Sequence, residues 1–182
     1  MIHRKLGVSA VSLILILAGS ASAQTKDDPW AAYRFLLGEW VGEGDGKPGQ
    51  GSGSFSLAPD LGGKILVRKN RNEIPAANGR PAVSHEDLLV VYRGTEGKRN
   101  RAIYFDNEDH VIHYTVTSGD DGKSLTFLSD AVPSQPRFRL TYTKGKGETV
   151  SIKFELAPPA KEEFRTYVEG KVRRKERKEP SK

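Results

Sequence analysis

The chain has no cysteine, one methionine and four histidines, and these shortages exclude several kinds of chemistry. Without cysteine there is no disulfide, no thiol nucleophile and no zinc or redox site built on thiolates. A fold without such cross-links depends on its hydrophobic core, which a chain of 182 residues is long enough to form.

Long apolar runs are also scarce, and the only one lies near the start. Leu6–Ala18 follows the positive residues Arg4 and Lys5 and precedes a small-residue motif that ends at Ala23. The run is shorter than the ~20 residues that span a bilayer. We therefore expect residues 1–23 to be a signal peptide cleaved after Ala23, and the mature protein to be periplasmic or secreted without a transmembrane segment. The alternative is an uncleaved membrane anchor.

Charge is unevenly spread along the chain. The formal net charge is +6, of which Arg4 and Lys5 contribute two, and many of the remaining cations lie in the last dozen residues. A basic tail can contact anionic lipid headgroups or nucleic acid. The interspersed Glu176 and Glu179 instead favour a solvated, disordered tail over residues 175–182, with no nucleic-acid partner. The expected domain then covers residues 24–174.

Helical periodicity is almost absent. Asp28 followed by Pro29 is a helix-start signal, the residues from Trp30 to Leu37 are amphipathic, and Gly38 is a stop signal. One short N-terminal helix is therefore expected, and nothing else in the sequence has a convincing helical period.

The rest of the chain consists of short β-rich runs separated by Gly, Pro, Asn and Asp turns. The ten runs are Gly38–Asp45, Gly53–Ala58, Lys64–Glu73, Ser84–Arg93, Asn100–Asp106, His110–Thr117, Lys123–Asp130, Arg137–Thr143, Thr149–Leu156 and Glu163–Arg173. Hairpin spacing between neighbours predicts an all-β fold, either an antiparallel up-and-down barrel of about ten strands or a sandwich. The barrel is favoured because closure leaves no exposed edge.

The two faces of these runs differ in character. Phe138, Leu140 and Tyr142 alternate with polar residues, as does the run around Phe154, whereas Tyr104 shares a face with an aspartate. A tightly filled barrel favours a uniformly apolar interior, and a barrel with a cavity tolerates polar groups inside. This mixture favours a binding function.

Two segments resemble known barrel proteins. Gly38-Glu39-Trp40-Val41-Gly42-Glu43-Gly44 resembles the Gly-x-Trp-x-Gly opening of calycins, and its longer form resembles the nitrobindin-like branch. Residues 154–174 are similar to bacterial lipocalin-like proteins of the DUF1579 type. The resemblance implies a calycin barrel in which Trp40 closes one end and packs against a late-strand arginine, Arg173 or its neighbour Arg174.

The same resemblance bears on cofactors and ligands. Nitrobindins hold haem through a late histidine, but no histidine follows His113 here, so no cofactor is expected. Fatty-acid-binding relatives hold a carboxylate with Arg-x-Tyr on the last strand, a pattern that Arg165-Thr166-Tyr167 matches. Strand alternation leaves open whether Arg165 and Tyr167 face the interior or the solvent.

Metal and catalytic motifs are weak. His110 and His113 are three residues apart, which places them on opposite faces of a strand, so no metal site is expected. His85 and Asp87 share a face and are close enough for an interaction. No Gly-x-Ser-x-Gly turn marks a nucleophile.

The sequence thus predicts an exported lipocalin-like protein that binds a small hydrophobic or amphipathic ligand. The candidate ligand-binding residues are Tyr92, Tyr104, His113, Phe127, Tyr142, Arg165 and Tyr167. Trp40 and Arg173 are the candidate closure residues. The alternatives are a barrel hydrolase or isomerase with His85 or His113 as its base, and a filled barrel with a structural or interaction role. The ligand and the oligomeric state do not follow from the sequence.

Overall fold

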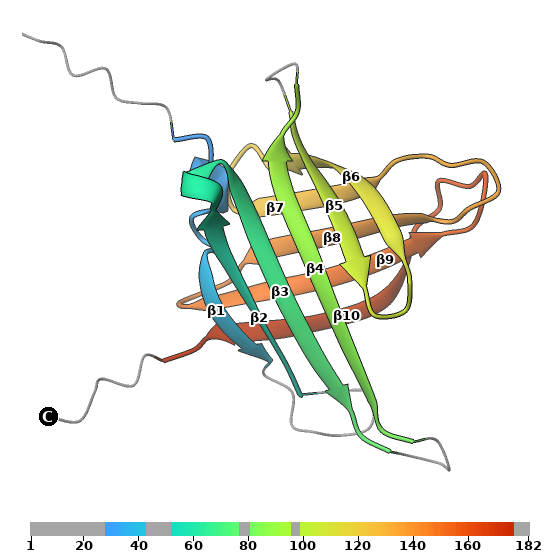
Figure 1. Cartoon of the computed structure of the whole chain (residues 1–182), viewed down its shortest axis with the longest axis horizontal. Coiled ribbons are helices and arrows are strands. Elements are labelled where there is room, and N and C mark those ends of the chain that lie inside the picture. The colour runs from blue at the N-terminus through green and yellow to red at the C-terminus, as the bar shows by residue number, and fades with distance from the viewer. Residues whose placement is uncertain (1–27, 43–51, 77–80, 96–98, 177–182) are drawn as a thin grey trace, which may run out of the picture.

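Ten antiparallel strands close into one barrel in the computed structural model, which describes residues 28–42, 52–76, 81–95 and 99–176 (Figure 1). The strands are β1 (Gly38–Gly42), β2 (Ser52–Asp60), β3 (Ile65–Ile74), β4 (Val83–Arg93), β5 (Asn100–Asp106), β6 (Val111–Ser118), β7 (Ser124–Ser129), β8 (Arg137–Lys144), β9 (Thr149–Ala157) and β10 (Arg165–Arg174). The predicted all-β, up-and-down barrel is confirmed.

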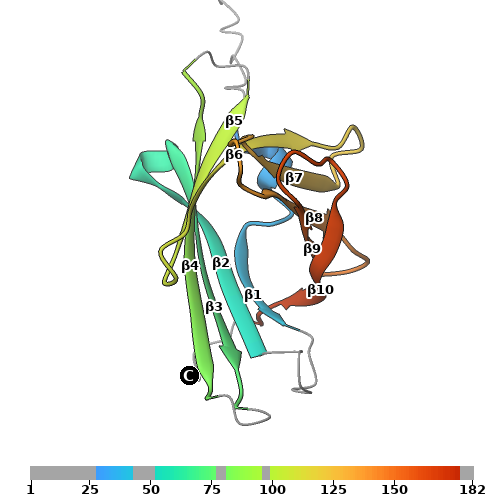
Figure 2. The same cartoon turned by 90° about the vertical axis from the view of Figure 1, so that its right-hand side faces the viewer.

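Every strand pairs with its neighbours in the sequence, and β1 pairs with β10 to close the ring. Tight turns make this order possible. Gly122 ends the turn between β6 and β7 at φ +66°, a left-handed conformation that glycine adopts without a Cβ penalty. Strands five places apart in a ten-strand ring lie across the interior from each other, so β3 faces β8 and β4 faces β9. Figure 2 shows β3 and β4 on one side of the barrel and β9 and β10 on the other.

The expected N-terminal helix is a single 3-10 turn, η1 (Ala31–Tyr33). Tyr33 in the turn and the flanking Trp30 and Leu36 are buried, at most 6% exposed, and they recur every three residues. Side chains three residues apart eclipse one another on a 3-10 helix, whereas on an α-helix they share a face but are offset. Consistent with this, Tyr33 N–H and Leu36 N–H each donate to the carbonyl three residues earlier, both at 2.8 Å.

The hydrophobic core fills the half of the barrel next to η1, which we call the η1 end. Each strand contributes its inward face there; the buried side chains include Phe55, Leu57, Leu66, Leu89, Val91, Tyr114, Val116, Leu125, Phe127, Leu140, Tyr142, Val150 and Val172. At the opposite end, the far end, the inward-facing residues of β3, β4 and β5 are polar. The interior therefore has a packed half and a half that is polar on the side of β3, β4 and β5.

The expected signal peptide (residues 1–23) and most of the expected tail (residues 177–182) lie outside the described residues. So do the last residues of the Gly-x-Trp-x-Gly-x-Gly motif, after Gly42. Within the described part of the chain, no helix has the length and apolar character to cross a membrane.

Candidate functional site in the far half of the barrel

A buried arginine spans the barrel where its two halves meet. Arg68 points inward from β3 and is 7% exposed. Its guanidinium donates on one side to the Tyr142 hydroxyl of β8, across the interior, and on the other side to Asp87 of β4. Asn70 Nδ2 also donates to Asp87, at 2.7 Å. These contacts form a layer of polar side chains between the packed half and the far half, which we call the polar floor.

A second set of polar residues continues from this floor toward the far end. His85 Nε2 lies 3.2 Å from the Tyr104 hydroxyl and 3.6 Å from Asp87 Oδ2, and Nδ1 of the same ring lies 2.9 Å from Glu108 Oε1. The Tyr104 hydroxyl lies 3.2 Å from Asp106 Oδ2. We call Arg68, Asn70, His85, Asp87, Tyr104 and Asp106 the polar cluster.

The charged groups of the polar cluster change the pKa values of its members. Burial raises the pKa of Tyr104, and the carboxylates of Asp87 and Asp106 raise it further, which together outweigh the opposite effect of Arg68. Burial alone would raise the pKa of Asp106. Hydrogen bonds from the backbone and side chain of His110 reverse this and hold that pKa below its usual range.

Aromatic side chains lie across the barrel from the polar cluster. Phe138 of β8 and Phe154 of β9 point inward and stack with ring centroids 5.8 Å apart and planes within 7° of parallel. The ring of Tyr167 of β10 is nearly perpendicular to that of Phe154, at 79°, with the two centroids 6.2 Å apart. These three rings form what we call the aromatic wall. Its two phenylalanines are half-buried, and Tyr167 is 73% exposed, so solvent reaches this side of the interior.

A β-bulge in β10 explains the position of Tyr167. The register with β9 shifts between Thr166 and Val168, so that Tyr167 has no direct partner. Val168 pairs with Phe154, and Arg165 pairs with Leu156, which is also inward-facing by alternation. Arg165 and Tyr167 therefore lie at the far-end rim, where both are exposed, and the alternation rule alone does not describe this segment.

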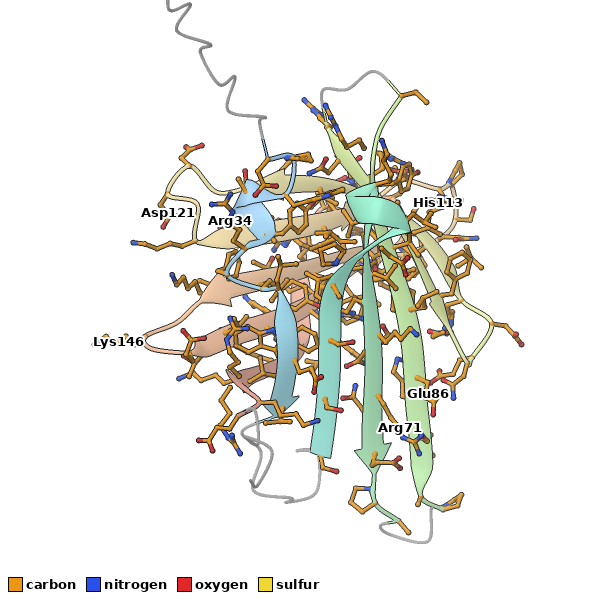
Figure 3. All side chains as sticks on the ribbon, turned by 60° about the vertical axis from the view of Figure 1, so that its left-hand side comes forward. Arg34, Arg71, Glu86, His113, Asp121 and Lys146 are labelled. Atoms are coloured by element: carbon orange, nitrogen blue, oxygen red, sulfur yellow. The ribbon has the colours of Figure 1, made fainter. Side chains whose placement is uncertain are left out.

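The structure distributes the other predicted ligand residues over three locations. Tyr104 belongs to the polar cluster, and Phe127 and Tyr142 are core side chains that are at most 1% exposed. Tyr92 pairs with Arg101 on the outer face. His113 is exposed on the outer face of β6, and Figure 3 shows it at the edge of the molecule. Only part of the predicted set therefore meets in one place.

Trp40 closes the η1 end, and its arginine partner is Arg174. The guanidinium carbon of Arg174 lies 4.5 Å from the Trp40 ring centroid, and Trp40 Nε1 donates to Leu36 O at 2.8 Å. Arg173 pairs with Val41 and is exposed on the opposite face. Of the two arginines named from the sequence, the second therefore occupies the position next to the ring.

Sequence reasoning missed Arg68, Asn70 and Asp106 as members of one site. The signal was present in β3, where Leu66, Arg68 and Asn70 alternate with outward residues. Arg68 lies on the same strand face as the buried Leu66, which indicates a cation in the interior. Its partners, Asp87 of β4 and Tyr142 of β8, come from other strands, so the sequence near Arg68 does not reveal them. The shared face of His85 and Asp87 was predicted, and the structure has it.

Two surface hollows, of about 340 and 500 Å³, lie at the η1 end. The larger is bordered by Trp40, Arg174 and the turns at Gly122 and Gly147. No residue of the polar cluster lines either hollow. We take the polar cluster and the aromatic wall as the candidate site because they face each other across the far half of the interior.

Among the described residues, no three His, Asp or Glu side chains converge in a way that would hold a metal ion. No protein-family model matches the sequence, and comparison with curated proteins gives no match. The closed ten-stranded antiparallel barrel fits a calycin- or lipocalin-like fold.

Proposed function

We propose that the protein binds a small apolar or amphipathic molecule in the far half of its barrel, between the polar cluster and the aromatic wall. The core of the η1 half is filled with side chains, and the two hollows at that end lie at the surface. The far half combines hydrogen-bonding groups on β3 to β5 with rings on β8 to β10, the mixture typical of small-molecule sites.

The stacked pair of Phe138 and Phe154 carries this proposal. Both rings point inward, yet they are only partly buried, and Val168, which pairs with Phe154, is 53% exposed. They pack against the core on one side, whereas in a filled barrel such inward apolar groups would be covered completely, as Phe127 is. Burying them under a ligand would contribute about 25 cal/mol for each Å² of apolar surface.

We further propose that this barrel is an exported member of the lipocalin-like proteins that the Gly38–Trp40 and late-strand motifs resemble. Export predicts a mature chain that starts at Gln24. N-terminal sequencing of the protein from its native envelope checks this, and a start at Met1 would contradict it.

Native mass spectrometry of the protein purified from its own envelope tests binding. A co-purifying lipid-sized mass is the expected result. Clean apo protein, together with no thermal stabilisation across a panel of fatty acids and lipids, would contradict the proposal.

A matched pair of variants locates the site. Val168→Lys places a charge at the inner rim and is expected to abolish binding. Val111→Lys makes the same change at the same end of the barrel, on the outer face of β6, where Val111 is 57% exposed. Binding should survive in that variant, and equal loss in both would contradict the location.

One observation favours an enzyme as the second candidate. Glu108, His85 and Tyr104 form a carboxylate–imidazole–hydroxyl chain with contacts of 2.9 and 3.2 Å, an arrangement that can move a proton. His113, the other candidate base, lies on the outer face, so this hypothesis now depends on His85. An activity that persists unchanged in His85→Ala would remove it.

A further inference from the structure

We infer that the ligand's polar group is a hydrogen-bond donor, an ammonium or an alcohol, rather than a carboxylate. This inference rests on the proposed function. It differs from the Arg-x-Tyr reading of the sequence, which implies a carboxylate ligand. There are three reasons. The guanidinium of Arg68 is already hydrogen-bonded, carboxylates outnumber cations around Tyr104, and the opposite side of the interior is formed by aromatic rings.

Arg68 is the interior cation, but both ends of its guanidinium fork are occupied. One end donates to Asp87 and the other to the Tyr142 hydroxyl. The side chains of Arg68 and Asp87 are 8% and 4% exposed, so the pair is neutralised and shielded. A carboxylate that took both ends of this fork would have to displace Asp87, which would leave one of two carboxylates buried without its cation. The Nε–H of Arg68 has no hydrogen-bond partner among the described residues, but it is itself buried and so is not open to an incoming group.

Carboxylates outnumber the cation at this site. Asp87 and Asp106, whose side chains are 4% exposed, and Glu108, which is 55% exposed, are three carboxylates against the single buried guanidinium of Arg68. Positive charges on both His85 and His110 would balance this excess without making the site positive. Arg165 at the opposite rim is exposed, as Glu108 is, so water and salt weaken the charges of both. Burial is the main cause that raises the pKa of Tyr104, and the carboxylates of Asp87 and Asp106 raise it further.

The aromatic wall suits a cation or a neutral chain better than an anion. The faces of aromatic rings carry negative potential and attract ammonium groups. Phe138 and Phe154 also supply apolar surface for a hydrocarbon chain. An amphipathic amine can therefore place its chain on this wall and its donor group toward Tyr104 and the carboxylates.

The test compares three probes of equal chain length on the purified full chain: octylammonium, octanol and octanoate, titrated by calorimetry at neutral pH and fixed salt. Octylammonium should bind at least about tenfold more tightly than octanoate, with octanol in between. Glu108→Gln keeps a group that can contact His85 but removes a charge, and it should reduce the preference for octylammonium over octanoate about threefold or more.

The control is Glu86→Gln, which removes the same charge from the outer face of β4. Glu86 is 54% exposed and pairs with Arg71 at 3.0 Å, and Figure 3 shows both side chains outside the barrel. This variant should leave the preference unchanged. Octanoate binding as tightly as octylammonium, or equal effects of the two variants, would overturn the inference while the proposed function stands. If none of the three probes binds, both proposals fail.

Discussion

At the scale of single residues, Gly38 shows why the opening motif contains glycine. It adopts φ +116°, a conformation that side chains rarely allow. A Cβ at this position would also come within 2.5 Å of an Arg174 guanidinium nitrogen. That guanidinium stacks on Trp40 and donates to Leu37 O at 2.6 Å, so it is not free to move aside.

Gly38→Ala should therefore lower the free energy of unfolding by about 1–3 kcal/mol, measured by urea denaturation. Gly170→Ala in β10 is the matched control. Its Cβ would meet nothing within 4 Å, and its φ is not in the positive region. The control should stay within about 0.5 kcal/mol of wild type, and equal losses would contradict the role assigned to Gly38.

The second prediction for a single residue concerns the Tyr142 hydroxyl, which accepts a hydrogen bond from the buried guanidinium of Arg68. Tyr142→Phe leaves one side of the Arg68 guanidinium without this acceptor and should cost about 1–3 kcal/mol in the free energy of unfolding. Tyr167→Phe removes a hydroxyl from a side chain that is 73% exposed and should be nearly neutral. If Tyr142→Phe has the same free energy of unfolding in urea as wild type, the hydrogen bond between Arg68 and Tyr142 does not stabilise the fold.

At the scale of elements, η1 and the start of β1 act together as a lid on the η1 end. Trp30 Nε1 donates to Gly63 O at 2.9 Å and Trp40 stacks on Phe55 at 6.2 Å, so two tryptophans tie the lid to β2 and the turn after it. Trp40→Ala should cost roughly 3–5 kcal/mol, since the ring is 1% exposed.

The control for Trp40 is its neighbour Val41, which points to the outer face. Val41→Ala should cost less than about 1 kcal/mol in the same denaturation experiment. A Trp40→Ala variant that melted like wild type but lost a ligand would place Trp40 in a binding site instead of the lid.

The elements themselves were largely predictable from the sequence, because period-two alternation and turn residues mark strands locally. Phe138, Leu140 and Tyr142 share the inner face as alternation predicts. The short N-terminal helix expected between Trp30 and Leu37 is only the 3-10 turn Ala31–Tyr33, which the three-residue spacing of Trp30, Tyr33 and Leu36 fits. The bulge at Tyr167 was not predictable, since an extra residue in one strand leaves no local signature.

At the scale of the whole molecule, the division of the interior into two halves depends on pairings that the sequence does not encode locally. Arg68 and Tyr142 are 74 residues apart and meet because β3 and β8 are opposite in the closed ring. The order of strands follows from hairpin lengths, but which residues face each other across the ring depends on strand tilt and stagger. The contact of Arg68 with Tyr142 therefore depends on closure, whereas the polar cluster itself comes from the neighbouring strands β3, β4 and β5.

An ion-pair group on the outer wall makes the stability of the whole barrel depend on pH. Glu155 of β9 is 5% exposed and accepts from Arg139 Nε at 2.6 Å and lies 3.1 Å from Lys153 Nζ. The hydrogen bond from Arg139 is the main cause that lowers the pKa of Glu155 to about 2 from its ordinary 4.5.

A lowered folded-state pKa means that the unfolded chain binds the proton more tightly, so acid favours unfolding. The contribution of Glu155 is fully present above pH 4.5 and is lost as the pH falls toward 2. Asp106 adds to the loss in the same direction, because its pKa is also lowered. Because Arg139 is 36% exposed, we discount the Glu155 contribution to about 1–2 kcal/mol.

Thermal melts between pH 7 and pH 2 should therefore show Tm falling most steeply below about pH 4.5. Glu155→Gln keeps the shape of the side chain and removes the titrating group, so it should start from a lower Tm at pH 7 and show a shallower decline in acid. Glu162→Gln is the control: Glu162 also pairs with an arginine at 2.6 Å, but its side chain is 72% exposed, so water screens the pair. Its Tm curve should follow that of wild type, and a Glu155→Gln curve that did the same would show that the outer-wall pair contributes nothing to acid sensitivity.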